Sequence, residues 1–176
     1  MNDCQALIRA KKGDIKAFET ILKAYEKRVF ALAFSYLHNS EDAKDIAQEV
    51  FFRAYKYLKS FNEEKDFFPW LYSIELNLIR NHINHKKDNR ETCSGDILEN
   101  VIYLDEGLLS ADDKIVFFKA LDELNEDDKH FLVLRYIMAL EIKEIAALKN
   151  KNENQVRVGI FRAKDRLKQK LQEEGL

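Results

Sequence analysis

The chain has 176 residues, enough for one large domain or two small ones. One proline and five glycines are too few for the turns of an all-β protein, and a net charge of −2 gives no global sign of a nucleic-acid partner. Cys4 and Cys93 lie far apart and form no disulfide or zinc pattern, so a reducing compartment is expected. No run reaches the roughly 18 apolar residues of a membrane span and no signal peptide opens the chain, which predicts a cytoplasmic protein.

Four helices are predicted in the first half of the chain, because apolar residues recur there at spacings of three and four. Ser40 is the predicted N-cap of the third helix, followed by the anions Glu41 and Asp42 that a helix N-terminus favours. Asp66 is the predicted cap of the fourth, with Pro69 in the first turn, where its missing N–H costs nothing. These helices cover residues 3–10, 13–37, 39–58 and 67–87.

Helical periodicity fades between residues 89 and 112, where acidic side chains give a local net charge of about −5. Ser94, Gly95 and Gly107 lie among them, a composition typical of a linker. The sequence therefore predicts an all-α protein of two small helical domains, residues 1–88 and 113–176, joined by an acidic linker.

Four more helices follow the linker, and the last two are separated only by a tight turn. Asn150 can adopt the left-handed conformation that such a turn requires. The inner stripe of the last helix consists of Val156, Ile160, Ala163 and Leu167. Its opposite face centres on Asn154, Val158, Phe161, Arg162, Asp165 and Gln169.

This arrangement is typical of a helix-turn-helix, whose second helix lies in the DNA major groove while basic side chains contact phosphates. Residues 151–170 contain seven cations and two anions, which favours that interpretation. An ordinary helical hairpin with a solvated charged face is the alternative, and these residues alone leave it open.

Two segments in the right order resemble a known family. Residues 41–61 (EDAKDIAQEVFFRAYKYLKSF) and 67–83 (FFPWLYSIELNLIRNHI) resemble region 2 of bacterial sigma factors, in its D-x-x-Q-E-x-F-x-x-A-Y and W-L-Y-x-I-x-x-N-x-x-x-N elements. Residues 121–171 resemble region 4 of the same family. With no other domain present, the chain is similar to a minimal sigma factor of the extracytoplasmic-function (ECF) type.

The resemblance implies partners and roles for particular residues. The D-x-x-Q-E helix of the family docks on the β′ subunit of core RNA polymerase, which implies that Asp45, Gln48 and Glu49, with Arg53 beside them, bind polymerase here. Family members also contact the β subunit and are commonly held inactive by an anti-sigma factor, so both are expected partners.

Region 2 of the family melts the promoter −10 element and holds a flipped base, which aromatic faces and amide edges can do. By resemblance, Phe61 and Asn77 line the pocket for that base, and the loop 62–66 tunes which base fits. Arg80, Asn81 and the tail of Lys86 and Lys87 are expected along the phosphates. Trp70, by contrast, is expected in the core, since large aromatic residues at helix starts usually pack.

In region 4, the resemblance assigns contacts to the −35 duplex to Arg157, Arg162 and Lys164, and Asn154 and Val158 share the groove-facing side. Val158 can touch a thymine methyl group but cannot form a hydrogen bond.

Several residues depart from the family pattern. Val158 and Gly159 stand where a small polar residue and a base are usual, and Glu75 stands where a small residue is usual. The sequence places Glu75 as an anion beside the presumed DNA track. Together, these departures predict weaker or altered promoter recognition, not necessarily its loss.

Three functions are compatible with these features. The leading hypothesis is a sigma factor that binds core RNA polymerase and directs promoter recognition and melting. The alternatives are a sigma-like protein-interaction module with little DNA reading and a stand-alone helix-turn-helix regulator, which would have to dimerise.

An enzyme is not expected. His82 and His85 are spaced H-x-x-H, but no carboxylate or cysteine completes a metal set, and His82 is expected to face the DNA track. The chain has no glycine-rich phosphate loop and no recognisable triad. We therefore predict no catalytic residue, metal, cofactor or small-molecule substrate.

Overall fold

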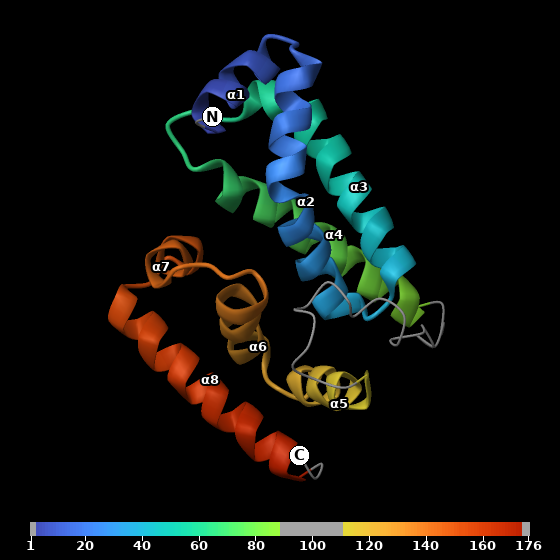
Figure 1. Cartoon of the computed structure of the whole chain (residues 1–176), viewed down its shortest axis with the longest axis vertical. Helices are drawn as coiled ribbons and strands as arrows, with labels where there is room; N and C mark the ends of the chain where they lie inside the picture. The colour runs from blue at the N-terminus through green and yellow to red at the C-terminus, as the bar shows by residue number, and fades with distance from the viewer. Residues whose placement is uncertain (1–2, 89–110, 174–176) are drawn as a thin grey trace. The chain divides into compact units, whose positions relative to one another are not determined.

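The computed structural model describes residues 3–88 and 111–173, with side chains over residues 5–86 and 116–173. The chain divides into two compact units, Met1–Gly95 and Asp96–Leu176. Each unit is built from helices, and the described ranges contain no β-strand, as the sequence predicted (Figure 1). The predicted linker, residues 89–112, lies outside the described residues except for its last two, which belong to a helix.

The elements of the first unit are α1 (Asp3–Lys11), α2 (Ile15–Leu37), α3 (Ser40–Tyr57), the short 3-10 helix η1 (Leu58–Ser60) and α4 (Phe67–Asp88). This unit packs two long helices, α3 and α4, and the short helix α1 against the long helix α2. Val29 and Leu32 of α2, Val50 of α3 and Leu71 of α4 are fully buried where these helices meet. Figure 1 shows α3 running alongside α2 and α4 crossing the two, and each of these three helices contacts the other two.

The N-cap of α3 is Asn39, one residue before the predicted Ser40. The Asn39 side chain accepts a hydrogen bond from the Asp42 N–H at 3.0 Å, which is the geometry that an N-cap needs. Ser40 is the first helical residue and is 5% exposed. The sequence pattern missed this because asparagine and serine are adjacent and both cap well. Pro69 is the third residue of α4, within its first turn, as predicted.

A cluster of aromatic rings closes the end of the first unit where α4 begins. Tyr25 of α2 packs on Phe67 with ring centroids 5.6 Å apart, and Phe61 contacts Phe67 at 5.5 Å and Trp70 at 5.0 Å. Phe67 and Phe61 are each 5% exposed. Burial of large aromatic side chains dominates the energy of small cores, so most of the rings in this stretch stabilise the fold.

The second unit carries the predicted helix-turn-helix. Its elements are α5 (Ala111–Asp122), α6 (Glu126–Leu132), a π-helical turn η3 (Val133–Ile137), α7 (Ile142–Lys149) and α8 (Glu153–Glu173). Asn150, between α7 and α8, has a φ of 50° and lies in the left-handed region, as predicted. The predicted inner stripe of α8 is confirmed as buried: Val156, Ile160, Ala163 and Leu167.

Charged side chains fasten α6 to its two neighbours. Asp128 of α6, 6% exposed, binds the Arg166 guanidinium of α8, and its backbone N–H is capped by Asn125 at 3.0 Å. Asp127 pairs with Lys149 of α7 at 2.7 Å, and the hydrogen bond from Lys149 lowers the pKa of the Asp127 carboxyl. These contacts hold the three helices as one body.

Gly159 is required by packing, a role that the sequence did not reveal. A Cβ atom at this position would lie 2.5 Å from Cε2 of Phe131 on α6, closer than real contacts allow. The ring of Phe131 is buried and the ammonium groups of Lys149 and Lys151 lie 5.4 and 5.8 Å from its centroid. The absence of a side chain at Gly159 therefore lets α6 approach α8 closely.

Glu75 does not lie beside a DNA track, as the sequence suggested; it is in the core. Its side chain is 0% exposed, in line with the buried Leu71 and Ile79 one helical turn to either side. Burial raises the pKa of the Glu75 carboxyl well above its ordinary value of 4.5. The backbone of Ala33 lowers that pKa to a smaller extent, yet neither Glu75 oxygen has a partner with hydrogen-bond geometry.

Replacement of Glu75 by methionine should stabilise the first unit in a pH-dependent way. The pKa of Glu75 is higher in the folded protein than in the unfolded chain, so the folded state binds more protons. The free energy of unfolding therefore falls as pH rises from about 4.5 towards the raised pKa. Glu75→Met should therefore raise the free energy of unfolding by about 1–3 kcal/mol at pH 8 and by less at pH 5. Urea unfolding followed by the fluorescence of Trp70, the only tryptophan, measures this.

The control is Glu19→Met, at an exposed position of α2. An equal gain in stability at both pH values would contradict the view that Glu75 is a buried ionisable group.

Replacement of Gly159 by alanine should destabilise the second unit. Alanine in a helix is normally better than glycine by about 1 kcal/mol, but the close contact with Phe131 forces a shift that should cost more, for a net loss of about 1–3 kcal/mol. Thermal unfolding followed by circular dichroism tests this. In a Phe131→Leu background, where the contact is relieved, the same change should become neutral or favourable; an unchanged penalty there would mean that Phe131 is not the cause.

Candidate polymerase and nucleic-acid interfaces

The four residues predicted to bind polymerase lie on one outward strip of α3. Asp45 and Gln48 are exposed, and the side chains of Glu49 and Arg53 are 41% and 43% exposed. Glu49 Oε1 and Arg53 Nε are 2.6 Å apart, which fixes both side chains along the helix. Phe52, beside this strip, is 63% exposed. The strip thus offers a carboxylate, an amide, an ion pair and a free aromatic ring to a partner.

A second set of predicted residues lies along the outer side of α4. Asn77, Arg80 and Asn81 are all exposed, and their spacing of three and four places them on one face. This face combines two amides with one guanidinium. Such groups can hydrogen-bond to base edges and to phosphates.

Phe61, which was predicted to line the base pocket with Asn77, has a covered ring in this structure. Its ring is 5% exposed and is covered by Phe67 and Trp70, the last of which is half-buried. In this conformation a base cannot stack on Phe61. The physical reason is the strong gain from burying an aromatic ring next to two others, which the sequence could not distinguish from stacking on a base.

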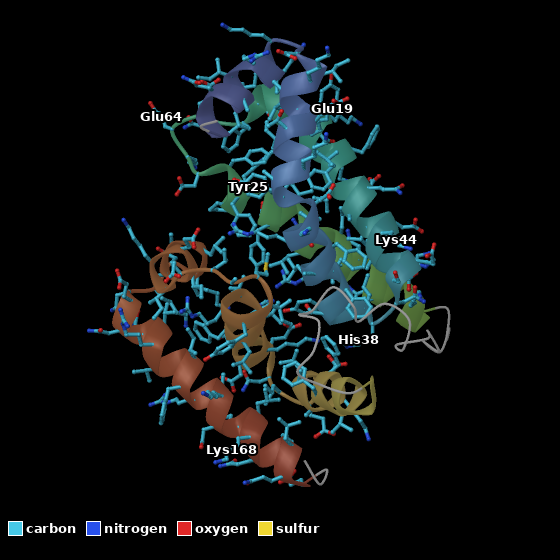
Figure 2. All side chains as sticks on the ribbon, viewed as in Figure 1. Glu19, Tyr25, His38, Lys44, Glu64 and Lys168 are labelled. Atoms are coloured by element: carbon cyan, nitrogen blue, oxygen red, sulfur yellow. The ribbon has the colours of Figure 1, made fainter. Side chains whose placement is uncertain are left out.

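The loop 62–66, predicted to tune base choice, is exposed and is anchored from α1. Lys11 Nζ donates a hydrogen bond to the Phe61 carbonyl oxygen at 2.9 Å and lies 2.8 Å from Glu63 Oε1. Asn62 Oδ1 accepts a hydrogen bond from the Glu64 N–H at 3.0 Å. The Glu64 side chain itself points away from the fold (Figure 2). Lys11 was not singled out in the sequence, because its contact spans fifty positions.

His82 does not face outward as predicted. Its side chain is 26% exposed, and its Nε2 atom lies 3.5 Å from Asp42 at the start of α3. Lys86 Nζ lies 2.6 Å from the other oxygen of Asp42. His82 therefore belongs to the contact between the end of α4 and the start of α3.

The predicted −35 residues all lie at the surface of α8. Asn154, Arg157, Val158, Arg162 and Lys164 are exposed, while the stripe on the other side of the helix is buried. Asn154, Val158 and Arg162 line a shallow depression together with Lys151 and Asn152 of the turn. Arg157 makes only a distant pair with Glu153, 3.4 Å away. Asp127, Asp128 and Phe131 of α6 line the depression as well, so cations and anions both surround a partly apolar floor.

The sequence placed Phe161 on the outer face of α8 but assigned no function to it. It is 74% exposed, and Val158, three residues before it, is 48% exposed. Its position on the side opposite the buried stripe was the available signal. Figure 2 shows Lys168 further along the same helix, also pointing outward.

Comparison with known proteins identifies the chain. The family model for Sigma-70 region 2 matches residues 21–88, and the model for Sigma-70, region 4 matches residues 116–167. The chain is 31% identical over 177 residues to the ECF RNA polymerase sigma-E factor of Escherichia coli K12, with 93% of this chain and 91% of that protein covered.

The chain belongs to the sigma-70 family, in its extracytoplasmic-function group. The RNA polymerase sigma-H factor of Pseudomonas aeruginosa PAO1 is 28% identical to this sigma factor over 181 residues, covering 97% and 94% of the two chains. Members of the family are non-enzymatic factors that bind core RNA polymerase and recognise promoter DNA.

Two solved structures share the fold of this sigma factor. One, described as CnrH in complex with the cytosolic domain of CnrY, has a TM-score of 0.74 at 21% identity and covers 98% of this chain and 99% of that chain. The other, the sigma factor RpoE in complex with the anti-sigma factor NepR from Bartonella quintana, has a TM-score of 0.67 at 22% identity and covers 89% and 98%. Across the helices that the structure describes, none is both long and apolar enough to cross a lipid bilayer.

Proposed function

We propose that this sigma factor docks on core RNA polymerase through the outward strip of α3, engages the melted −10 element along α4, and contacts the −35 duplex with the outer face of α8. The observation that carries the proposal is the division of α8, whose apolar stripe is buried while Arg157 and Arg162 are exposed on the other side. A helix whose basic face is free of its own domain is available to the DNA backbone and groove.

The α3 strip supports the polymerase contact for an energetic reason. Asp45 and Gln48 are exposed and make no contribution to the core, so their presence does not follow from folding. The Glu49–Arg53 pair and the exposed ring of Phe52 beside them add the combination of polar groups and aromatic surface that favours a protein interface.

For the −10 element, we assign the direct contacts to Asn77, Arg80 and Asn81 rather than to Phe61. The amides can select a base and Arg80 can hold phosphate. Phe61 supports the base of the loop 62–66, whose carbonyl at Phe61 and carboxylate at Glu63 are held by Lys11. A base can stack on Phe61 only if this loop moves.

We further propose the cytoplasm as the compartment and an anti-sigma factor as a regulator. RpoE of Bartonella quintana, whose fold this chain shares, was solved in complex with the anti-sigma factor NepR. An acidic linker over residues 89–112, between helical domains at residues 1–88 and 113–176, completes the proposed organisation.

The two alternative functions are less well supported. A protein-interaction module that does not bind DNA would not require the exposed basic residues of α8, which are Arg157, Arg162 and Lys164. A stand-alone regulator does not require a second helical domain with the region 2 match.

Removal of the α3 contacts should abolish polymerase binding without unfolding the chain. The double change Asp45→Ala and Gln48→Ala deletes one anion and one amide from an exposed strip, so stability should change by less than about 0.5 kcal/mol. Pull-down of purified bacterial core RNA polymerase should fall at least tenfold. The matched control, Glu19→Ala with Thr20→Ala, deletes one anion and one hydroxyl from an exposed part of α2 (Figure 2) and should bind normally. Normal binding by the Asp45/Gln48 variant would refute this docking strip.

Single replacement of Arg157 or Arg162 by alanine should weaken the −35 contact. Loss of one arginine contact to base or phosphate costs about 1–3 kcal/mol, which corresponds to roughly 5- to 150-fold in promoter binding. Promoter-dependent transcripts from holoenzyme, measured over a range of salt concentrations, report the loss and whether the salt slope falls by about one. Lys168→Ala, at an exposed position further along α8, should have a smaller effect. Equal effects of all three changes would argue for a general charge contribution rather than a placed contact.

A further inference from the structure

The outer face of α8 carries apolar surface at its centre. Val158 is 48% exposed and Phe161 is 74% exposed, on a helix whose other apolar side chains Val156, Ile160 and Leu167 are buried. The exposed part of these side chains adds nothing to the stability of their own domain. Two of them in adjacent positions on one face therefore call for an external partner.

The packing beneath this face restricts which side chains can point outward. Gly159 lies against the Phe131 ring, where even a Cβ atom would be 2.5 Å from Cε2, so residue 159 cannot supply a cation or a hydrogen-bond donor. Val158, next to it, has no polar atom in its side chain. Val158 and Phe161 therefore offer only hydrocarbon on this face, and the hydrogen-bonding groups near them are those of Asn154, Arg157 and Arg162.

The chemistry of the major groove identifies a match. Among the four bases only thymine presents a methyl group there, and contact with that methyl group is how an apolar side chain distinguishes bases. Val158 and Phe161 are three residues apart, which is about 4.5 Å along the helix axis and comparable to the step between neighbouring base pairs, about 3.4 Å. One apolar side chain can thus face each of two adjacent steps.

We propose that Val158, with Phe161 beside it, reads thymine 5-methyl groups in the −35 element, so that this sigma factor selects thymine by apolar contact at a step where a polar side chain would select by hydrogen bonding. This inference rests on the proposed placement of α8 in the −35 major groove. It assigns a base preference to one residue that departs from the family pattern. The flanking arginines supply affinity, and Val158 supplies discrimination.

Replacement of thymidine by deoxyuridine tests the contribution of the thymine methyl group alone. Holoenzyme reconstituted from core RNA polymerase and the full chain selects binding sites from duplexes randomised over the −35 element. Each thymidine in the selected sequence is then replaced singly by deoxyuridine, which removes only the 5-methyl group and keeps base pairing intact. Binding of each duplex is measured by competition.

We expect deoxyuridine to weaken binding about three- to fivefold at one or two positions, the effect of removing one buried methyl group from an apolar contact. In the Val158→Ser holoenzyme the penalty at one of these positions should disappear, because serine gains nothing from the methyl group. Phe161→Ala should remove the penalty at the neighbouring position. Lys168→Ala, the control on the same helix, should retain both penalties.

The outcomes are distinct. Enrichment of a −35 sequence that tolerates deoxyuridine at every position overturns the thymine inference and leaves the proposed function intact. A penalty that persists unchanged in Val158→Ser also overturns it, since the methyl group would then act through DNA shape or another residue. No enrichment of any −35 sequence overturns both the inference and the placement of α8 on DNA.

Discussion

Burial of one apolar stripe along α8 determines what the second unit can do. Val156 and Ala163 are 0% exposed, and Phe131 of α6 lies so close to Gly159 that no side chain fits between them. Once this side of the helix is fixed against α6, the positions of Asn154, Arg157, Val158 and Arg162 relative to solvent follow from the 100° rotation per residue. The proposed DNA-binding surface is thus the side of α8 that does not pack against its own domain. A change in the depth of the α6–α8 contact would alter the surface that we propose to contact DNA.

In the first unit, too, one side of a helix is fixed by packing, and there the burial includes a carboxyl group that lowers stability. On α4 the residues at a spacing of four, Leu71, Glu75 and Ile79, are all within 1% of complete burial. Glu75 thus introduces an acid without a hydrogen-bond partner into a core that consists mainly of aliphatic and aromatic side chains. Such a group costs stability, which other contacts must offset. The aromatic cluster of Tyr25, Phe61, Phe67 and Trp70 is one source of that stabilisation.

Sites on helix faces could be predicted because they follow from local periodicity. The α3 strip, the outer face of α4 and the outer face of α8 are all exposed where the sequence placed them. Glu75 and His82 were wrongly placed, because each depends on another element: the backbone region of α2 and Asp42 of α3. The covering of Phe61 by the rings of Phe67 and Trp70 was likewise not foreseen. Glu75 had a usable signal in its spacing with Leu71 and Ile79, which the charge of the side chain obscured.

The sequence by itself determined the helical class, the helix-turn-helix with Asn150 in the left-handed region, and the family, since these are encoded in spacings of three and four and in short motifs. Only the tertiary structure decided that Gly159 is a packing residue, that Lys11 anchors a loop fifty positions away, and that a carboxylate lies in the core. The physical reason is that periodicity reports the direction in which a side chain leaves its helix. What it meets there depends on chain segments that are distant in sequence.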